Sequence, residues 1–170
     1  MDKESKEELA NKAYELAIKY EMEYLNESQC TLAAIQDTLG MRNDDVFKAA
    51  TGFAGGVGLT GAGPCGAVSA GVIAISSKIG RERKHWKDPE KTRYKTYALA
   101  KKLCERFIEE YGGFHCGDIL KKLLGRTYNL WEPGEYEEYE KAGGHKKENC
   151  PTVAGNAAKW TVEILLDYEG

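Results

Sequence analysis

Apolar residues recur at helical spacing along almost the whole of this 170-residue chain. In the segment 4–24 they lie three or four positions apart among charged neighbours, and the same spacing returns in the segments that follow. No segment shows the sustained alternation of apolar and polar residues that is typical of a half-buried strand. The pattern therefore predicts an all-α protein, in which residues 1–170 form one single-domain helical bundle.

Capping residues, glycines and prolines divide the chain into the expected helices. These helices cover residues 4–24, 30–40, 43–52, 65–79, 88–111 and 118–125, and a terminal helix begins at Cys150. Residues 131–144 are expected to form an exposed loop or a short surface helix. The helix over 65–79 is apolar and slim, so we expect it at the crowded centre of the bundle. Its small residues are Ala67, Ala70, Gly71 and Ala74.

The charge balance excludes some classes of protein. The formal net charge is -3 and the two signs are mixed, whereas a protein that binds nucleic acid usually has a basic face. The first residues lack the apolar core of a secretory signal, and no apolar run approaches the roughly 20 residues that span a bilayer. We therefore expect a cytoplasmic protein that neither binds nucleic acid nor inserts into a membrane.

The chain has five cysteines, and the reducing cytoplasm disfavours a static disulfide framework. Four of them lie near expected helix starts: Cys30, Cys65, Cys116 and Cys150. Because backbone N–H groups at a helix start favour a thiolate over a thiol, these four are candidate metal ligands or reactive thiols. Cys104 lies in mid-helix on an apolar face and is expected in the core.

A glycine-rich loop leads into Cys65. Seven glycines from Gly52 to Gly66 imply tight turns, or a close approach of the backbone to other atoms. We expect the backbone N–H groups around Gly63 and Gly66 to donate hydrogen bonds to sulfur and so to help bind a cofactor. The stretch 56–61 also matches the dinucleotide pattern G-x-G-x-x-G, but a helix precedes it in place of the strand that this pattern requires.

The spacing of the cysteines limits the kind of site. No Cys-x-x-Cys pair occurs, which disfavours a zinc ribbon, a thioredoxin-type dithiol, a bacterial ferredoxin and a c-type haem. Four thiolates that converge from separate helices would suit an iron–sulfur cluster or tetrahedral zinc, whereas two converging pairs would suit dithiol chemistry. His115 and His145 lie close in sequence to two of the cysteines, so either is a candidate ligand or base. His85 belongs to a basic, exposed connection.

The order of these features resembles a family of small prokaryotic redox-active proteins named for the cysteine pattern C…GCAxxG…C…C. The resemblance covers residues 28–166 and rests mainly on the stretches 55–69 and 107–116 and on Cys150. It implies redox activity, and it places the family's characteristic cysteines at the same four positions that the helix starts select. The chain departs from the family's pattern at one position after Cys65, where Ala70 replaces a glycine and Gly71 follows.

We therefore expect an iron–sulfur cluster, or another metal such as zinc, with a role in electron transfer or redox sensing. Its expected ligands are Cys30, Cys65, Cys116 and Cys150. Such a role implies a redox partner protein. Three alternatives stay open: a thiol–disulfide protein without metal, a thiol enzyme with Cys65 as nucleophile, and a helical assembly module whose cysteines only pack. In the last case the helix over 68–79 would form a homodimer interface.

Overall fold

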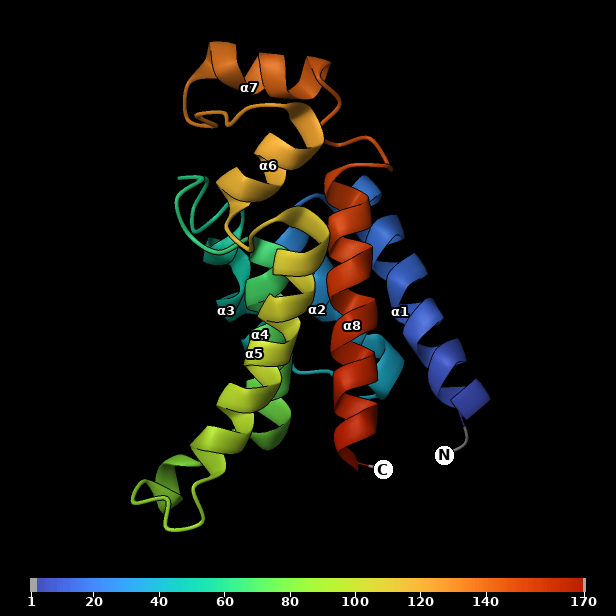
Figure 1. Cartoon of the computed structure of the whole chain (residues 1–170), viewed down its shortest axis with the longest axis vertical. Coiled ribbons are helices and arrows are strands. Elements are labelled where there is room, and N and C mark those ends of the chain that lie inside the picture. Colours follow the sequence, from blue (N-terminus) through green and yellow to red (C-terminus); the bar gives the residue numbers. More distant parts are fainter. Residues whose placement is uncertain (1–2, 170) are drawn as a thin grey trace.

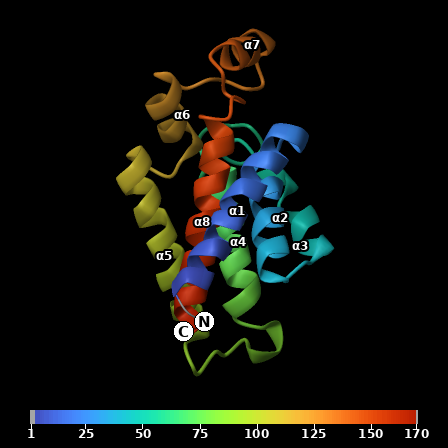
Figure 2. The same cartoon turned by 90° about the vertical axis from the view of Figure 1, so that its right-hand side faces the viewer.

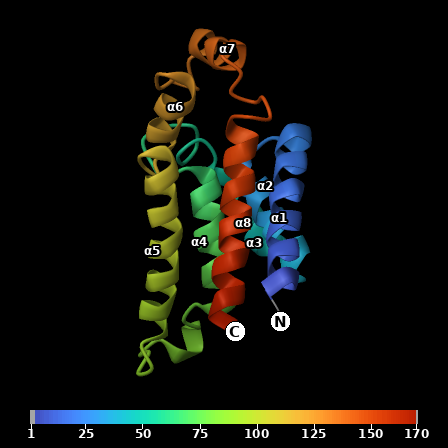
Figure 3. The same ribbon diagram turned by 45° about the vertical axis from the view of Figure 1, so that its right-hand side comes forward.

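The computed structural model describes residues 3–169, and long helices that run side by side form most of it (Figures 1 and 3). Eight α-helices follow one another in this range: α1 (Lys3–Tyr24), α2 (Glu27–Leu39), α3 (Asp44–Ala49), α4 (Gly66–Ile79), α5 (Thr92–Tyr111), α6 (Cys116–Leu124), α7 (Pro133–Lys141) and α8 (Cys150–Glu169). The all-α prediction is confirmed. None of these helices combines the length and the apolarity that are needed to cross a bilayer.

Small residues form the first core, between α1, α2, α4 and α8. Alanines at every third or fourth position of α1 let α8 and α2 approach it closely. The apolar face that predicted this helix is therefore the face that packs against α8 and α2. The buried alanines of this core include Ala10, Ala13, Ala17, Ala34, Ala70, Ala74, Ala154 and Ala158.

The helix α4 lies between α2, α5 and α8. At Gly71 a Cβ would lie 2.5 Å from Leu103 Cδ2 of α5 and 2.5 Å from Thr161 Oγ1 of α8, so glycine is needed for this close packing. The expectation of a slim helix in a crowded centre is confirmed. Half of the residues of α4 are consequently buried.

The second core joins α4, α5 and α8 through larger side chains. Phe107 is fully buried, and its ring meets the Trp160 ring edge-on at 5.2 Å between centroids. Cys104 is partly buried and packs against this core, as its place on the apolar face of α5 predicted.

The helices α6 and α7 lie across one end of the bundle (Figures 1 and 2). A small third core lies beneath them, with Leu120 and Tyr139 among its buried members. The helix α7 occupies the segment for which a loop or a short surface helix was expected, and Pro133 stands in its first turn. The first residues of α4 and α8 lie at this end of the bundle (Figure 3).

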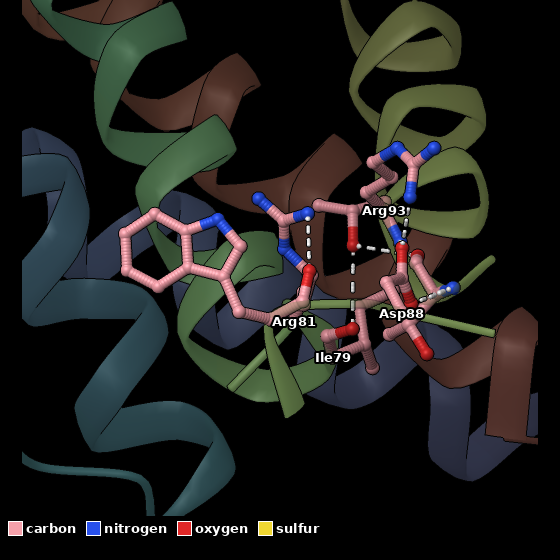
Figure 4. A network of polar contacts seen from close by, with 7 residues as sticks. Ile79, Arg81, Asp88 and Arg93 are labelled. Carbon is pink, nitrogen blue, oxygen red and sulfur yellow. Dashed lines mark hydrogen bonds and ion pairs between the residues drawn. The ribbon is translucent and has the colours of Figure 1, made fainter. Parts of the chain in front are cut away.

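The connection between α4 and α5 forms the opposite end of the bundle (Figures 1 and 3), and its polar contacts are drawn in Figure 4. Asp88 is buried there and accepts hydrogen bonds from the Thr92 N–H at 2.7 Å and from the Arg93 guanidinium at 2.8 Å. Because this carboxylate caps α5 from outside, the helix begins at Thr92 and not at 88, where the sequence predicted its start. His85 is exposed in this connection, as expected.

Candidate thiol centre

Two segments far apart in the sequence meet beside Cys65 and Cys116. Pro64 and His115 pair in an isolated antiparallel bridge. Next to it the Cys65 N–H donates to the Phe114 carbonyl at 2.9 Å, and the Cys116 N–H donates to a carbonyl of the glycine loop at 3.0 Å. Cys65 is the N-cap of α4 and Cys116 is the first residue of α6. The bridge therefore holds two cysteines and two helix starts next to each other.

The glycine loop packs directly against this bridge. A Cβ at Gly56 would lie 2.7 Å from the Cβ of Cys116, and a Cβ at Gly63 would lie 2.9 Å from the Gly56 carbonyl oxygen. Gly56 also has a φ of 69°, which glycine adopts readily. The loop is rich in glycine because its own turns and Cys116 lie too close together for side chains.

Cys150, the first residue of α8, adds a third thiol. Its sulfur accepts a hydrogen bond from the Tyr139 hydroxyl at 3.3 Å. The tyrosine ring lies over Gly144, where a Cβ would come within 2.0 Å of a ring carbon. Cys65, Cys116 and Cys150 line one small cavity of about 20 Å³, and we call these three residues the thiol centre.

Glu27 reaches the same cavity from the start of α2. Its Oε1 accepts a hydrogen bond from the Gly55 N–H at 2.6 Å, and the Gly66 N–H donates to the same carboxyl group. A Cβ at Gly66 would lie only 2.6 Å from Oε1, so glycine at this position makes room for the carboxyl group. Burial raises the pKa of Glu27, and the backbone donors oppose that rise. The thiol centre therefore has a neighbouring carboxyl group with an increased affinity for protons.

The thiols of the centre are harder to ionise than ordinary cysteines. Burial, with a further contribution from Glu27, raises the pKa of Cys116 and of Cys150 to about 12, and it raises the pKa of Cys65 as well. The Tyr139 hydroxyl acts in the opposite direction on Cys150. Helix starts favour thiolates, but burial has the larger effect here, so the resting thiols keep their protons.

Cys30 does not line the cavity of the thiol centre. It sits in the first turn of α2, and its thiol donates a hydrogen bond to the Leu25 carbonyl at 3.1 Å. It lines a separate cavity of about 270 Å³ between α1, α2 and α3. Burial raises its pKa, and the neighbouring Glu21 contributes to that rise. The structure thus brings together three of the four cysteines that the sequence selected.

One comparison with known proteins identifies a family. The profile described as "Putative redox-active protein (C_GCAxxG_C_C)" matches residues 25–164. The chain belongs to this family. The resemblance seen in the sequence is confirmed, and the matched range of this C_GCAxxG_C_C protein contains all four selected cysteines. Neither the curated proteins nor the solved structures gave a match.

The two histidines selected in this C_GCAxxG_C_C protein differ in position. The ring of His145 meets the ring of Tyr139 edge-on at 5.1 Å, and both of its nitrogens are buried without a partner among residues 3–169. Burial lowers the pKa of His145, so the ring is neutral at pH 7. His115 is exposed, and its Nδ1 lies 3.4 Å from the Asp118 carboxylate. His115 therefore contributes its backbone to the bridge beside Cys65 and Cys116, whereas the ring of His145 packs on Tyr139, the hydrogen-bond donor of Cys150.

The two glycines expected to bind a cofactor direct their N–H groups at oxygen. The Gly63 N–H donates to the Gly56 carbonyl at 3.1 Å. The Gly66 N–H donates to Glu27. Their contribution to the thiol centre is therefore the close packing of the loop and the placement of the Glu27 carboxyl group.

The sequence analysis did not select Glu21, Glu27 or Tyr139. Glu21 carries a signal that was available, because it continues the stripe of buried residues at 10, 13 and 17 of α1. It is only 2% exposed, and burial raises its pKa to about 8. Glu27 and Tyr139 carry no such signal, since their partners come from distant segments.

The described residues do not form a ready metal site. Thiols are soft donors that suit iron or zinc, yet no three His, Cys, Asp or Glu residues between 3 and 169 are arranged to hold a metal ion. The small cavity of about 20 Å³ has room for about one water molecule, which is much less than an iron–sulfur cluster requires. In this arrangement the thiols themselves are the candidate redox groups.

Proposed function

We propose that the protein is a thiol–disulfide redox protein, in which two thiols of the centre form and break a disulfide bond. The observation that carries this proposal is the convergence of three cysteines, from three helix starts, on one small cavity. Membership of a family described as redox-active supports it.

Cys150 is proposed as the thiol that reacts first. It is partly exposed, whereas Cys65 and Cys116 are only 5% and 8% exposed. Cys150 and Cys116 also line a second cavity of about 360 Å³, which we call the outer pocket. The Tyr139 hydroxyl and the start of α8 stabilise negative charge on the Cys150 sulfur. A reactant that enters the outer pocket therefore meets these two thiols.

The proposed step removes two electrons from Cys116 and Cys150. Two S–H bonds break, one S–S bond forms, and two protons and two electrons pass to an oxidant. Glu27 lines both cavities, so its carboxyl group can take up a proton from either thiol. Cys65 lines only the smaller of the two cavities, where it can exchange with the new disulfide as a third thiol.

An iron–sulfur cluster is the second candidate. The observation that favours it is the soft donor set that three helix starts bring to one cavity. The donors would be the three cysteines of the thiol centre, and Cys30 would lie outside the set. The cavity walls would have to move apart to admit a cluster, which is why it ranks second.

One preparation distinguishes the two candidates. Protein purified without oxygen is analysed for iron, zinc and acid-labile sulfide, and is then oxidised with diamide and digested for disulfide mapping by mass spectrometry. We expect no stoichiometric metal or sulfide, and a Cys116–Cys150 disulfide that dithiothreitol reverses. The Cys104→Ser variant is the control and should behave as wild type, because Cys104 packs against the second core on α5. Stoichiometric iron and sulfide, or no such disulfide after diamide, would contradict the proposal.

A further inference from the structure

The outer pocket is large enough for a small organic molecule, at about 360 Å³. Leucine, tryptophan and tyrosine side chains line much of its wall, among them Leu120, Leu130, Trp131 and Tyr136. Because Cys116 and Cys150 line the same pocket, a molecule bound there would lie against the two reactive thiols.

Two side chains of this wall carry buried polar atoms without a partner. Glu21 is 2% exposed, and its Oε2 forms no hydrogen bond within the described range. Both ring nitrogens of His145 are also buried, and neither has a partner there. Buried polar groups in folded proteins almost always have a partner. We infer that polar atoms of a ligand complete these hydrogen bonds.

The charge of the wall limits the class of ligand. No lysine or arginine occurs among the described residues that line the outer pocket, whereas Glu21 and Glu27 are acidic. An anion would enter this apolar pocket with no cation to pair with, which is strongly unfavourable. The rings of Trp131, Tyr136 and Tyr139 offer flat apolar faces. The pocket therefore suits an uncharged planar ring with oxygen atoms at its edge.

We propose that the outer pocket binds a small uncharged quinone, which accepts the two electrons of Cys116 and Cys150. This inference rests on the proposed thiol–disulfide function and names its oxidant. The N–H group of the neutral His145 ring and the carboxyl group of Glu21 donate hydrogen bonds to the quinone oxygens. These contacts would satisfy the unpaired atoms and hold the ring against the thiols.

The electrons and atoms of this step balance. The Cys150 sulfur forms a bond to a ring carbon of the quinone, and the Cys116 sulfur then attacks the Cys150 sulfur. As the S–S bond forms, the C–S bond breaks and its electron pair enters the ring. The two thiol protons end on the two quinone oxygens. The products are one disulfide and one hydroquinone.

Binding is tested with duroquinone, whose methyl groups leave no open ring position for a lasting thiol adduct. The Cys116→Ser/Cys150→Ser double variant lacks both thiols of the proposed step, so its tryptophan fluorescence reports binding without that step. We expect saturable quenching, weakened about tenfold by the added change His145→Phe. The matched change His85→Phe, in the exposed connection at the other end of the bundle, should leave binding unaltered. The anionic anthraquinone-2,6-disulfonate should bind far more weakly.

Reaction is tested with wild-type protein and duroquinone without oxygen, and we expect one hydroquinone for each Cys116–Cys150 disulfide. Three results would overturn the quinone inference: no saturable binding, equally tight binding of the disulfonate, or binding insensitive to His145→Phe. If diamide forms the disulfide and duroquinone does not, the quinone inference fails alone. If diamide also forms none, the proposed function itself fails.

Discussion

Replacing Gly66 with alanine tests the packing that places Glu27 at the thiol centre. The new Cβ would lie 2.6 Å from Glu27 Oε1 and 3.0 Å from the Phe53 carbonyl oxygen. Ordinary contact begins near 3.4 Å, so the carboxyl group must move by about 0.8 Å. Its hydrogen bond with the Gly55 N–H, now 2.6 Å long, would then lengthen or break. The substitution therefore acts on the same carboxyl group that serves the thiols.

The expected loss of stability follows from these contacts. A hydrogen bond to a carboxylate contributes about 1.5–3 kcal/mol, and crowding in a packed region costs about 1–3 kcal/mol. These two costs are not fully additive, because moving Glu27 relieves the crowding. Alanine also has a higher helix propensity than glycine, which stabilises the folded protein by up to about 1 kcal/mol. We expect Gly66→Ala to lower the free energy of unfolding by about 2–4 kcal/mol, measured by urea denaturation.

The matched control is Gly134→Ala. Gly134 lies in the first turn of α7, as Gly66 lies in the first turn of α4, but a Cβ there would meet nothing within 4 Å. This variant should be as stable as wild type, or more stable by up to about 1 kcal/mol. The reasoning would be refuted if both variants changed stability by the same amount.

Two further predictions concern titration. Because burial raises the pKa of Glu21 to about 8 from an ordinary 4.5, the folded protein holds a proton that the unfolded chain releases between these values. The Glu21 contribution to stability should then fall as pH rises from 5 to 7.5, by up to about 1.4 kcal/mol per pH unit. The shifted pKa values of Glu27 and His145 remain in Glu21→Gln, so urea denaturation of this variant should give a profile that falls less steeply than that of wild type; parallel profiles would disprove this. Tyr139→Phe removes the hydroxyl donor of Cys150, so iodoacetamide should modify Cys150 roughly 3- to 10-fold more slowly at pH 9, with Cys104 as internal reference. An unchanged or faster rate would count against this role of Tyr139.

The sequence alone determined the helices, because their signals are local. The apolar stripe of α1 and the small residues of α4 each indicate structure within a few positions, and the structure agrees. The same local signals placed four cysteines at helix starts, where they are found. The start of α5 was predicted too early. Asp88 accepts a hydrogen bond from the Thr92 N–H across three intervening residues, 89–91, which do not belong to the helix.

Only the tertiary structure decided which of these cysteines meet. The bridge between Pro64 and His115 joins residues 51 positions apart, and it brings Cys65 to Cys116, while Cys30 turns toward Glu21. No local pattern encodes such pairings. The ionisation of the thiols was also decided at this level, because a helix start acts over one turn whereas burial depends on everything packed around the sulfur. The chain thus specified which thiols stand at helix starts, and the fold selected three of them for one cavity.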